Sequence, residues 1–174
     1  ISPPAAVNVV WLAEVDSTNQ VAARLVAAWA EDEDERLGDT LLVAGTQNAG
    51  RGRGDHAWAS PAGGLYATWL GWLGTADLAW LPLAAGVCLA AAVEDVLPGI
   101  AVGLKWPNDL VVVGRKLGGV LCHSRTRGDR SWSAVGIGVN VEGAPALGPD
   151  AHLPATSLRA LGATGDAEAA LWTV

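Results

Sequence analysis

Apolar and polar positions along the chain predict three strands and two helices in its first hundred residues. Segments 7–15, 40–46 and 65–73 are rich in β-branched residues or alternate with a period of two, which is typical of strands. Segments 18–30 and 79–97 are long and apolar enough to predict helices. The acidic run at 31–35 is interpreted as a solvated connection.

After residue 101 the pattern is one of strands joined by short turns. The expected strands are 102–106, 110–113, 116–124 and 131–141, with turns at 114–115 and 127–129. Strands joined by such short turns must pair antiparallel. We therefore predict an α/β fold with a mixed, largely antiparallel sheet and helices packed on one face.

A long glycine-rich segment at 47–64 carries no strand or helix pattern, and loops of this length are usually functional. It contains Gly50-Arg51-Gly52-Arg53-Gly54, which sets two cations on a flexible backbone. Neither a Rossmann fingerprint nor a Walker loop is present. The arginines, rather than a helix N-terminus, must therefore supply the positive field.

Composition limits the class of protein. With 174 residues, 51% of them hydrophobic, the chain can form one domain with a real core. A formal charge of −7 argues against binding nucleic acid, and the apolar run at 78–93 is too short to span a membrane. Cys88 and Cys122 are expected to be buried free thiols, which indicates a reducing, cytoplasmic setting.

The chain has only two lysines, Lys105 and Lys116. Lysine offers a compact point charge, which suits one developing or transferring charge such as a phosphate oxygen. Lys105 opens Lys-Trp-Pro-Asn-Asp, and Lys116 opens Lys-Leu-Gly-Gly-Val-Leu. From the residues alone, Lys105 has the stronger case for a catalytic role, because a residue that follows a Gly-Arg turn is often only exposed.

Six segments in this order resemble the motifs of biotin protein ligases. They are Asp16-Ser17-Thr18-Asn19, Gln47-Asn48-Ala49-Gly50-Arg51-Gly52-Arg53, Trp58-Ala59-Ser60-Pro61, Lys105-Trp106-Pro107-Asn108-Asp109, Lys116-Leu117-Gly118-Gly119-Val120-Leu121 and Gly136-Ile137-Gly138-Val139-Asn140-Val141. The resemblance implies an enzyme that activates biotin with MgATP to biotinyl-5′-adenylate and then transfers it to a lysine of a biotin carboxyl carrier domain. It implies the monofunctional type without a DNA-binding domain.

The resemblance also assigns site residues. The catalytic residues it implies are Lys105 and Arg53. The biotin-binding residues it implies are Ser17, Thr18, Asn19, Gln47, Gly50, Arg51, Lys105, Gly118 and Gly119. The nucleotide-binding residues it implies are Arg51, Arg53, Trp58, Lys116 and Asn140. Mg²⁺ is expected to accompany ATP, with no metal site on the protein itself.

Simpler interpretations stay open for each motif. Residues 17–19 could act simply as a helix cap, and the loop arginines could serve solubility. Trp58 could be a core residue, and Lys105 could lie on the surface with its stem buried. Two other functions also stay open. A biotin-binding module without activity would keep the head-group residues, and lipoate ligases or octanoyl transferases share the architecture.

Two departures from the family pattern follow Arg53. Where the family usually has glycine and arginine, this chain has Asp55 and His56. An acidic residue opposes phosphate binding, and histidine replaces a permanent cation.

The chain is further expected to be a single catalytic domain over residues 1–174, truncated before the family's small C-terminal β domain.

Overall fold

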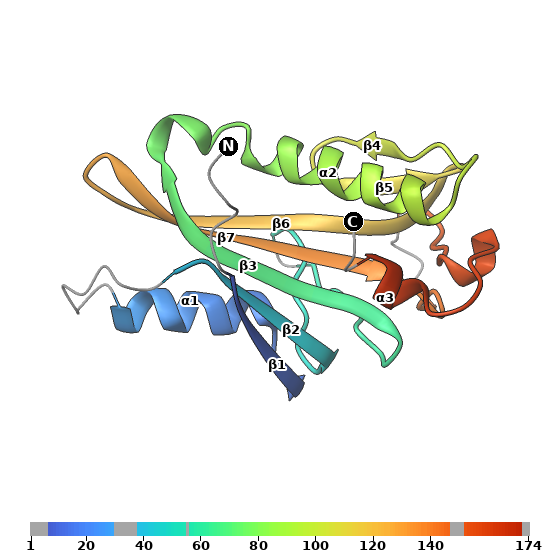
Figure 1. Cartoon of the computed structure of the whole chain (residues 1–174), viewed down its shortest axis with the longest axis horizontal. Helices are drawn as coiled ribbons and strands as arrows, with labels where there is room; N and C mark the ends of the chain where they lie inside the picture. Colours follow the sequence, from blue (N-terminus) through green and yellow to red (C-terminus); the bar gives the residue numbers. More distant parts are fainter. Residues whose placement is uncertain (1–6, 30–37, 55, 147–151, 172–174) are drawn as a thin grey trace.

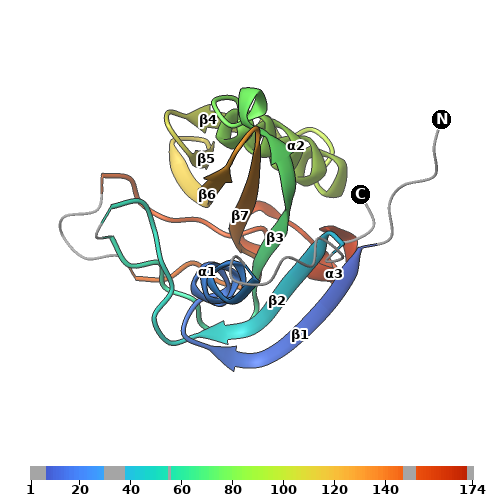
Figure 2. The ribbon, with the colours of Figure 1, turned by 90° about the vertical axis from the view of Figure 1, so that its left-hand side faces the viewer.

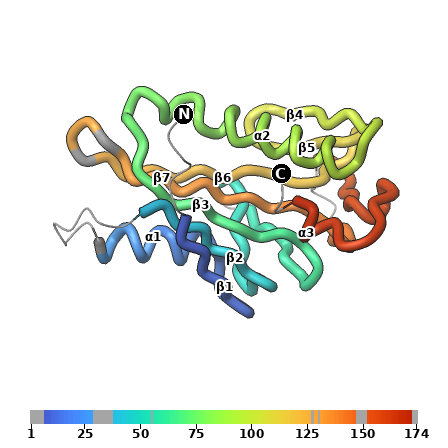
Figure 3. The backbone as a smooth tube through the Cα atoms, viewed as in Figure 1, coloured from blue at the N-terminus to red at the C-terminus, as the bar shows by residue number. Residues whose placement is uncertain are grey.

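One seven-stranded sheet runs through the part of the chain that the computed structural model describes, residues 7–29, 38–54, 56–146 and 152–171 (Figure 3). The strands are β1 (Asn8–Val15), β2 (Thr40–Gln47), β3 (Gly64–Gly74), β4 (Gly103–Lys105), β5 (Asp109–Val112), β6 (Arg115–Arg127) and β7 (Arg130–Asn140). Their order is β1-β2-β3-β7-β6-β5-β4, and β1–β2 is the parallel pair among antiparallel ones. The prediction of a mixed, largely antiparallel sheet is confirmed.

The helices lie on both faces of this sheet, so the expectation that they share one face is wrong. α1 (Thr18–Trp29) links β1 to β2 and packs on one face, whereas α2 (Leu81–Val96) and α3 (Ala167–Leu171) pack on the other (Figures 1 and 2). The strand register shows why. Leu42 and Val43 are neighbours in β2, yet Leu42 packs with α1 and Val43 belongs to the core beneath α2. Central strands that are buried on both faces carry no polar face that could reveal where each helix packs.

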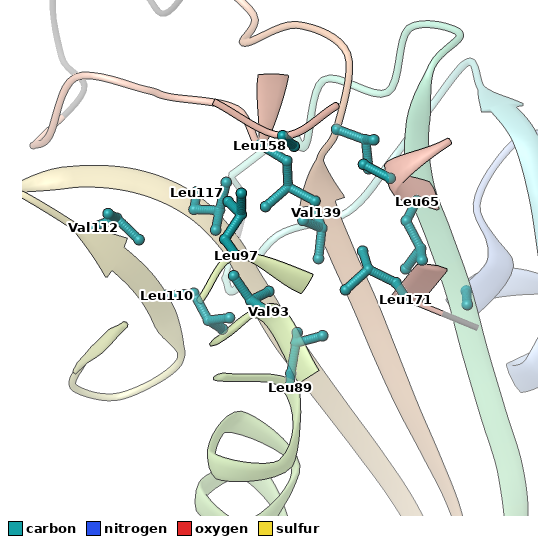
Figure 4. Packing of buried hydrophobic residues seen from close by; sticks show 14 of the residues in the cluster. Leu65, Leu89, Val93, Leu97, Leu110, Val112, Leu117, Val139, Leu158 and Leu171 are labelled. Carbon is teal, nitrogen blue, oxygen red and sulfur yellow. The ribbon is translucent and has the colours of Figure 1, made fainter. Parts of the chain in front are cut away.

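The larger core lies between the sheet, α2 and the C-terminal segment (Figure 4). Leu89, Val93 and Leu97 pack against Leu110 of β5 and Val139 of β7. Leu158 and Leu171 extend the same cluster. Burying one leucine of this kind stabilises a fold by roughly 1.5–3 kcal/mol, so the C-terminal segment is a structural part of the domain.

Several boundaries differ from those expected. The second helix begins at Leu81, after a 3₁₀ turn at Thr75–Asp77, and β4 ends before Trp106 because residues 106–108 form a turn. The turn between β5 and β6 is Val113-Gly114, both with positive φ. The run at 31–35 lies outside the described residues. Among the described residues, no helix has both the length and the apolar character to cross a membrane.

The two cysteines are free thiols, as predicted, but only one is shielded. Cys122 is half-buried against the larger core, where burial raises its pKa to about 11. Cys88 is exposed on α2, so the expectation that it is buried is wrong. The outer surface of α2 is itself apolar, and sequence periodicity therefore could not place this thiol.

Candidate active site

A pocket of about 720 Å³ opens beside α1 on the face of the sheet that this helix covers. This volume is typical of a small-molecule site. The wall is built from the N-terminus of α1, the loop 48–63 (teal, on the left in Figure 2), the turn after β4, strands β6 and β7, and the segment 152–155. Six parts of the sequence, from residue 17 to residue 155, therefore meet here.

Hydrogen bonds join the polar side chains at the α1 end of the pocket. The backbone N–H and the hydroxyl of Thr18 both donate to Gln47 Oε1, at 2.8 and 3.2 Å. Gln47 Nε2 donates to Ser60 Oγ at 2.7 Å. Beneath them, Thr68 Oγ1 lies 2.8 Å from Thr18 Oγ1 and 2.6 Å from Asn19 Oδ1. Because these groups are buried, or half-buried in the case of Gln47, and already partnered, they present their remaining donors and acceptors in fixed directions.

An ion pair anchors the start of α1. Arg24 donates to both carboxylate oxygens of Asp16, at 2.6 and 2.9 Å. This hydrogen bonding lowers the pKa of Asp16 to about 2. The backbone N–H of Ala49 donates to the Asp16 carbonyl at 2.9 Å, which ties the loop to the same point.

The glycine-rich loop folds back on itself. Trp58 N–H donates to the Gly50 carbonyl at 2.9 Å, and Arg51 pairs with Ala57 as a β-bridge. A Cβ at Gly50 would overlap the Trp58 carbonyl oxygen, so Gly50 shapes the loop and is absent from the pocket lining. Arg51 and Arg53 do line the pocket, and His56 lines it as an exposed residue. Asp55 lies outside the described residues.

Both lysines of the chain converge on one carboxylate, Asp109, at the first residue of β5. Lys116 Nζ lies 2.6 Å from Asp109 Oδ1, and Lys105 Nζ lies 3.9 Å from Asp109 Oδ2. The side chain of Lys116 is 27% exposed and that of Lys105 is 47% exposed. Nothing in the sequence pattern indicated that Asp109 would pair with both lysines. A carboxylate between two cations holds both ammonium groups close to one point.

Trp58 forms the wall beside Lys116. The ammonium of Lys116 lies 5.3 Å from the centroid of the indole ring, within range of a cation–π interaction. The indole packs onto Gly138 of β7, where a Cβ would come within 2.8 Å of Trp58 Nε1. This Nε1–H is buried and has no hydrogen-bond partner among the residues that the structure describes. Trp58 is therefore part of the site and not only of the core.

The two adjacent glycines of β6 have different surroundings. Gly119 lines the pocket, and a Cβ there would lie 3.2 Å from the Asn108 carbonyl oxygen. Gly118 is outside the lining, and its missing Cβ would lie 2.6 Å from the Gly138 carbonyl oxygen of β7. Close packing between strands is therefore the physical reason for a glycine at 118.

The segment after β7 closes the remaining side of the pocket, which the sequence pattern did not reveal. Lys116 N–H donates to the Pro154 carbonyl and Thr156 N–H donates to the Lys116 carbonyl, both at 2.8 Å. Asn140 is buried, and its Nδ2 donates to the Thr156 carbonyl at 2.9 Å. Asn140 lines the pocket, but in this structure its amide group holds the segment in place.

The pocket is strongly cationic within an acidic chain. The cationic side chains that line it are Arg51, Arg53, Lys105 and Lys116. Among the described lining residues, Asp109 is the single carboxylate, and it is engaged by Lys116. No group of three or more His, Cys, Asp or Glu side chains in the described part of the chain is placed to hold a metal ion. The pocket therefore suits a small anion that also makes directed hydrogen bonds with the polar groups at the N-terminus of α1.

Most of the residues predicted from the sequence meet in this pocket. Those that line it are Ser17, Thr18, Asn19, Gln47, Arg51, Arg53, Trp58, Lys105, Lys116, Gly119 and Asn140. Gly50 and Gly118 stand behind it. The residues that sequence reasoning missed are Thr68, Asp109, Gly136, Gly138 and the segment 152–155. Thr68 left no signal, since a threonine in a strand is ordinary.

Fold and pocket together define a mixed-sheet protein with a cationic pocket, of a size that suits a small molecule, on one face of the sheet. The chain belongs to the biotin/lipoate A/B protein ligase family, whose profile matches residues 11–140. It is 35% identical over 148 residues to a biotin–[acetyl-CoA-carboxylase] ligase of Paracoccus denitrificans, covering 79% of this chain and 56% of the relative. It is 37% identical over 162 residues to the ligase of the same name from Mycobacterium tuberculosis, covering 87% of this chain and 54% of the relative.

Solved structures of biotin protein ligases share the fold. The ligase from Leishmania major in complex with biotinyl-5-AMP superposes with a TM-score of 0.73 at 30% identity, covering 98% of this chain and 73% of that one. The ligase from Aquifex aeolicus in complex with biotin and ATP gives a TM-score of 0.70 at 35% identity, covering 95% of this chain and 66% of that one. The chain thus spans about half the length of its curated bacterial relatives and up to about three quarters of these solved ones.

Proposed function

We propose that this chain is the catalytic part of a biotin protein ligase, which activates biotin with MgATP and transfers it to a carrier lysine. The observation that carries the proposal is the convergence of Lys105 and Lys116 on Asp109, in the same pocket as the polar network of Thr18 and Gln47. One end is built to bind directed polar groups, and the other is built to bind negative charge. Relatives that are crystallised with biotin and ATP or with biotinyl-5-AMP support this arrangement.

Each end of the pocket then has a role. The ureido ring of biotin carries N–H donors and a carbonyl acceptor, which the groups around Thr18 and Gln47 would pair. The apolar ring system and tail would run along Gly119 and Trp58. The carboxylate would then reach the two lysines, while Arg51 and Arg53 on the loop face the ATP phosphates.

In the first step a biotin carboxylate oxygen attacks the α-phosphorus of ATP, the bond to the β-phosphate oxygen breaks, and pyrophosphate leaves. The protein forms no covalent bond, so catalysis consists of positioning and charge stabilisation. Lys116 is less exposed than Lys105 and stands against Trp58. We therefore assign to Lys116 the larger share in stabilising the α-phosphate, and to Lys105 a second cation nearer the rim.

In the second step the amine of a carrier lysine attacks the carboxyl carbon of the adenylate. An amide forms, AMP leaves with the electron pair of the anhydride bond, and the amine releases a proton. The acceptor would be a biotin carboxyl carrier domain of a biotin-dependent carboxylase, in keeping with the names of the relatives. The free thiols Cys88 and Cys122 agree with a reducing cytoplasm as the place of this reaction.

Mg²⁺ would enter as the MgATP complex. The described lining offers one carboxylate, which Lys116 engages, so the metal ion would be held mainly by the phosphate oxygens. When bound, the ion neutralises phosphate charge and favours the departure of pyrophosphate.

Pyrophosphate release from MgATP, measured with biotin, lipoate or octanoate, tests the proposal. We expect biotin-dependent release, followed by mass addition of one biotinyl group to an added carrier domain. Calorimetric binding of biotin without pyrophosphate release would instead identify a binding module without activity. Release that depends on lipoate or octanoate would identify another activity of this fold.

A further inference from the structure

Thr68 occupies an unusual position in the middle of β3. Its side chain is 0% exposed, and its neighbours on the same face of the strand are Tyr66 and Leu70. A hydroxyl in such a place is costly unless it is hydrogen-bonded. Thr68 Oγ1 meets Thr18 Oγ1 and Asn19 Oδ1, both from the first turn of α1.

The cross-strand partner of Thr68 on β7 is Gly136. A Cβ on Gly136 would overlap the amide of Asn19, so this amide occupies the space that a side chain would take. Asn19 Nδ2 also donates to the Leu121 carbonyl of β6 at 3.1 Å. The Asn19 amide is thus held from three neighbouring strands, by Thr68 on β3, Gly136 on β7 and Leu121 on β6.

From this geometry we infer that Thr68 is a positioning residue that sets the specificity of the head-group end of the pocket. Thr68 fixes the amide of Asn19 and the hydroxyl of Thr18. Thr18 in turn fixes Gln47 through two hydrogen bonds to Oε1. The inference rests on the proposed function and names the group that holds its biotin-binding residues in place.

This arrangement gives Asn19 a different role from the one expected. Its Oδ1 accepts from Thr68 and its Nδ2 donates to Leu121, so its amide locks α1 onto the sheet. The polar groups left to meet a ureido ring are then those of Ser17, Thr18 and Gln47, whose positions depend on that lock. A ligand without matching polar groups would leave them unpaired, which is how such a site discriminates.

The test uses Thr68→Val, which keeps the shape and removes the hydroxyl, and Thr68→Ser, which keeps the hydroxyl. Biotin affinity is measured by calorimetry, and KM for biotin and kcat by pyrophosphate release. We expect Thr68→Val to raise the Kd and KM for biotin roughly ten- to a hundredfold, because it leaves a buried Asn19 oxygen without its donor. The kcat at saturating biotin and the KM for ATP should change little, and Thr68→Ser should restore most of the affinity.

A matched control removes another fully buried hydroxyl from the same sheet. Ser133 of β7 is 0% exposed and bonds to Ser124, away from the pocket. Ser133→Ala should lower the melting temperature without changing biotin affinity. If Thr68→Val lowers stability as Ser133→Ala does but leaves biotin affinity unchanged, the inference is overturned.

A second variant covers the case in which Thr68→Val does not fold. Gly136→Ala pushes the Asn19 amide from the opposite side, and it should weaken biotin binding at unchanged KM for ATP. Unchanged biotin affinity in a folded Gly136→Ala protein would count against the positioning role of the Asn19 amide. Failure of the parent chain to bind biotin would instead overturn the proposed function, and the inference with it, so the two failures are distinguishable.

Discussion

At the scale of single residues, the charge of the site depends on the placement of the chain's two lysines, Lys105 and Lys116. Two lysines of different exposure share the carboxylate of Asp109, and Lys116 also lies over the indole ring of Trp58. Rarity in the sequence identified both residues, and the Gly-Arg turn before Lys116 led to Lys105 being ranked first. Depth in the pocket gives a ranking that differs from the one expected from the sequence.

The first prediction tests this ranking with Lys116→Ala and Lys105→Ala. Loss of a preorganised charge at the transferring phosphate typically costs about a hundredfold or more in rate. We expect this for Lys116→Ala, and a loss of roughly tenfold for Lys105→Ala, whose ammonium is more exposed and better replaced by water. The measurement is kcat for pyrophosphate release at saturating biotin and ATP.

Arg125→Ala supplies the control, because Arg125 is an exposed cation of β6 outside the pocket lining. Its kcat should match that of the parent. A larger loss in Lys105→Ala than in Lys116→Ala would return the central role to Lys105.

The second prediction concerns the two thiols. Cys88 is exposed, whereas burial raises the pKa of Cys122 to about 11, so at pH 8 little of its thiolate is present. Iodoacetamide should alkylate Cys88 at least about ten times faster, as followed by peptide mass spectrometry. Cys88→Ser should remove the fast phase. Equal rates at both thiols would show that the core beside β6 opens readily.

At the scale of elements, α1 matters because its first turn forms the polar end of the site. The described span of this helix, Thr18–Trp29, falls within the range 18–30 that the pattern of apolar residues predicted. It could not show which face of the sheet the helix covers, because β2, β3 and β7 are apolar on both sides. Nor could it show Thr68 or Gly136 beneath the helix, since their roles arise from the pairing of distant strands.

The third prediction uses the anchor of this helix. The pKa of Asp16 is lowered to about 2 from an ordinary 3.8 by Arg24, so the folded state binds this proton less tightly than the unfolded state. Its contribution to stability is therefore full above about pH 4 and is lost as the pH falls toward 2. Asp16→Asn should lower the free energy of unfolding slightly at pH 6, and this difference should vanish near pH 2. The effect is small because the pair faces solvent.

Denaturant unfolding between pH 2 and 7 measures this difference. Glu142→Gln is the matched control, since Arg159 lowers the pKa of Glu142 in a second exposed pair outside the pocket lining. Both variants should show the same kind of pH dependence, but only Asp16→Asn should also weaken biotin binding. A stability difference for Asp16→Asn that persists at pH 2 would contradict the electrostatic origin.

At the scale of the whole molecule, charge is distributed unevenly. The chain carries a formal charge of −7, yet four of its eleven lysines and arginines line one pocket. An acidic molecule with a cationic pocket repels anions in general and attracts those that fit the site. ATP binding is therefore expected to depend on single charges at the rim of the pocket.

The last prediction changes one such charge. His56 lies on the loop at the pocket rim, where the family pattern has arginine. At pH 8, His56→Arg adds a permanent cation that faces the phosphates, so ATP affinity should rise by roughly three- to tenfold at low ionic strength. Biotin affinity should stay the same, because its head group binds at the opposite end. Salt should reduce the gain in ATP affinity, since the added charge is exposed.

The control is His123→Arg, which adds the same charge to β6 outside the pocket lining and should leave ATP affinity unchanged. If both substitutions raise ATP affinity equally, the effect comes from net charge alone, and the loop does not face the nucleotide.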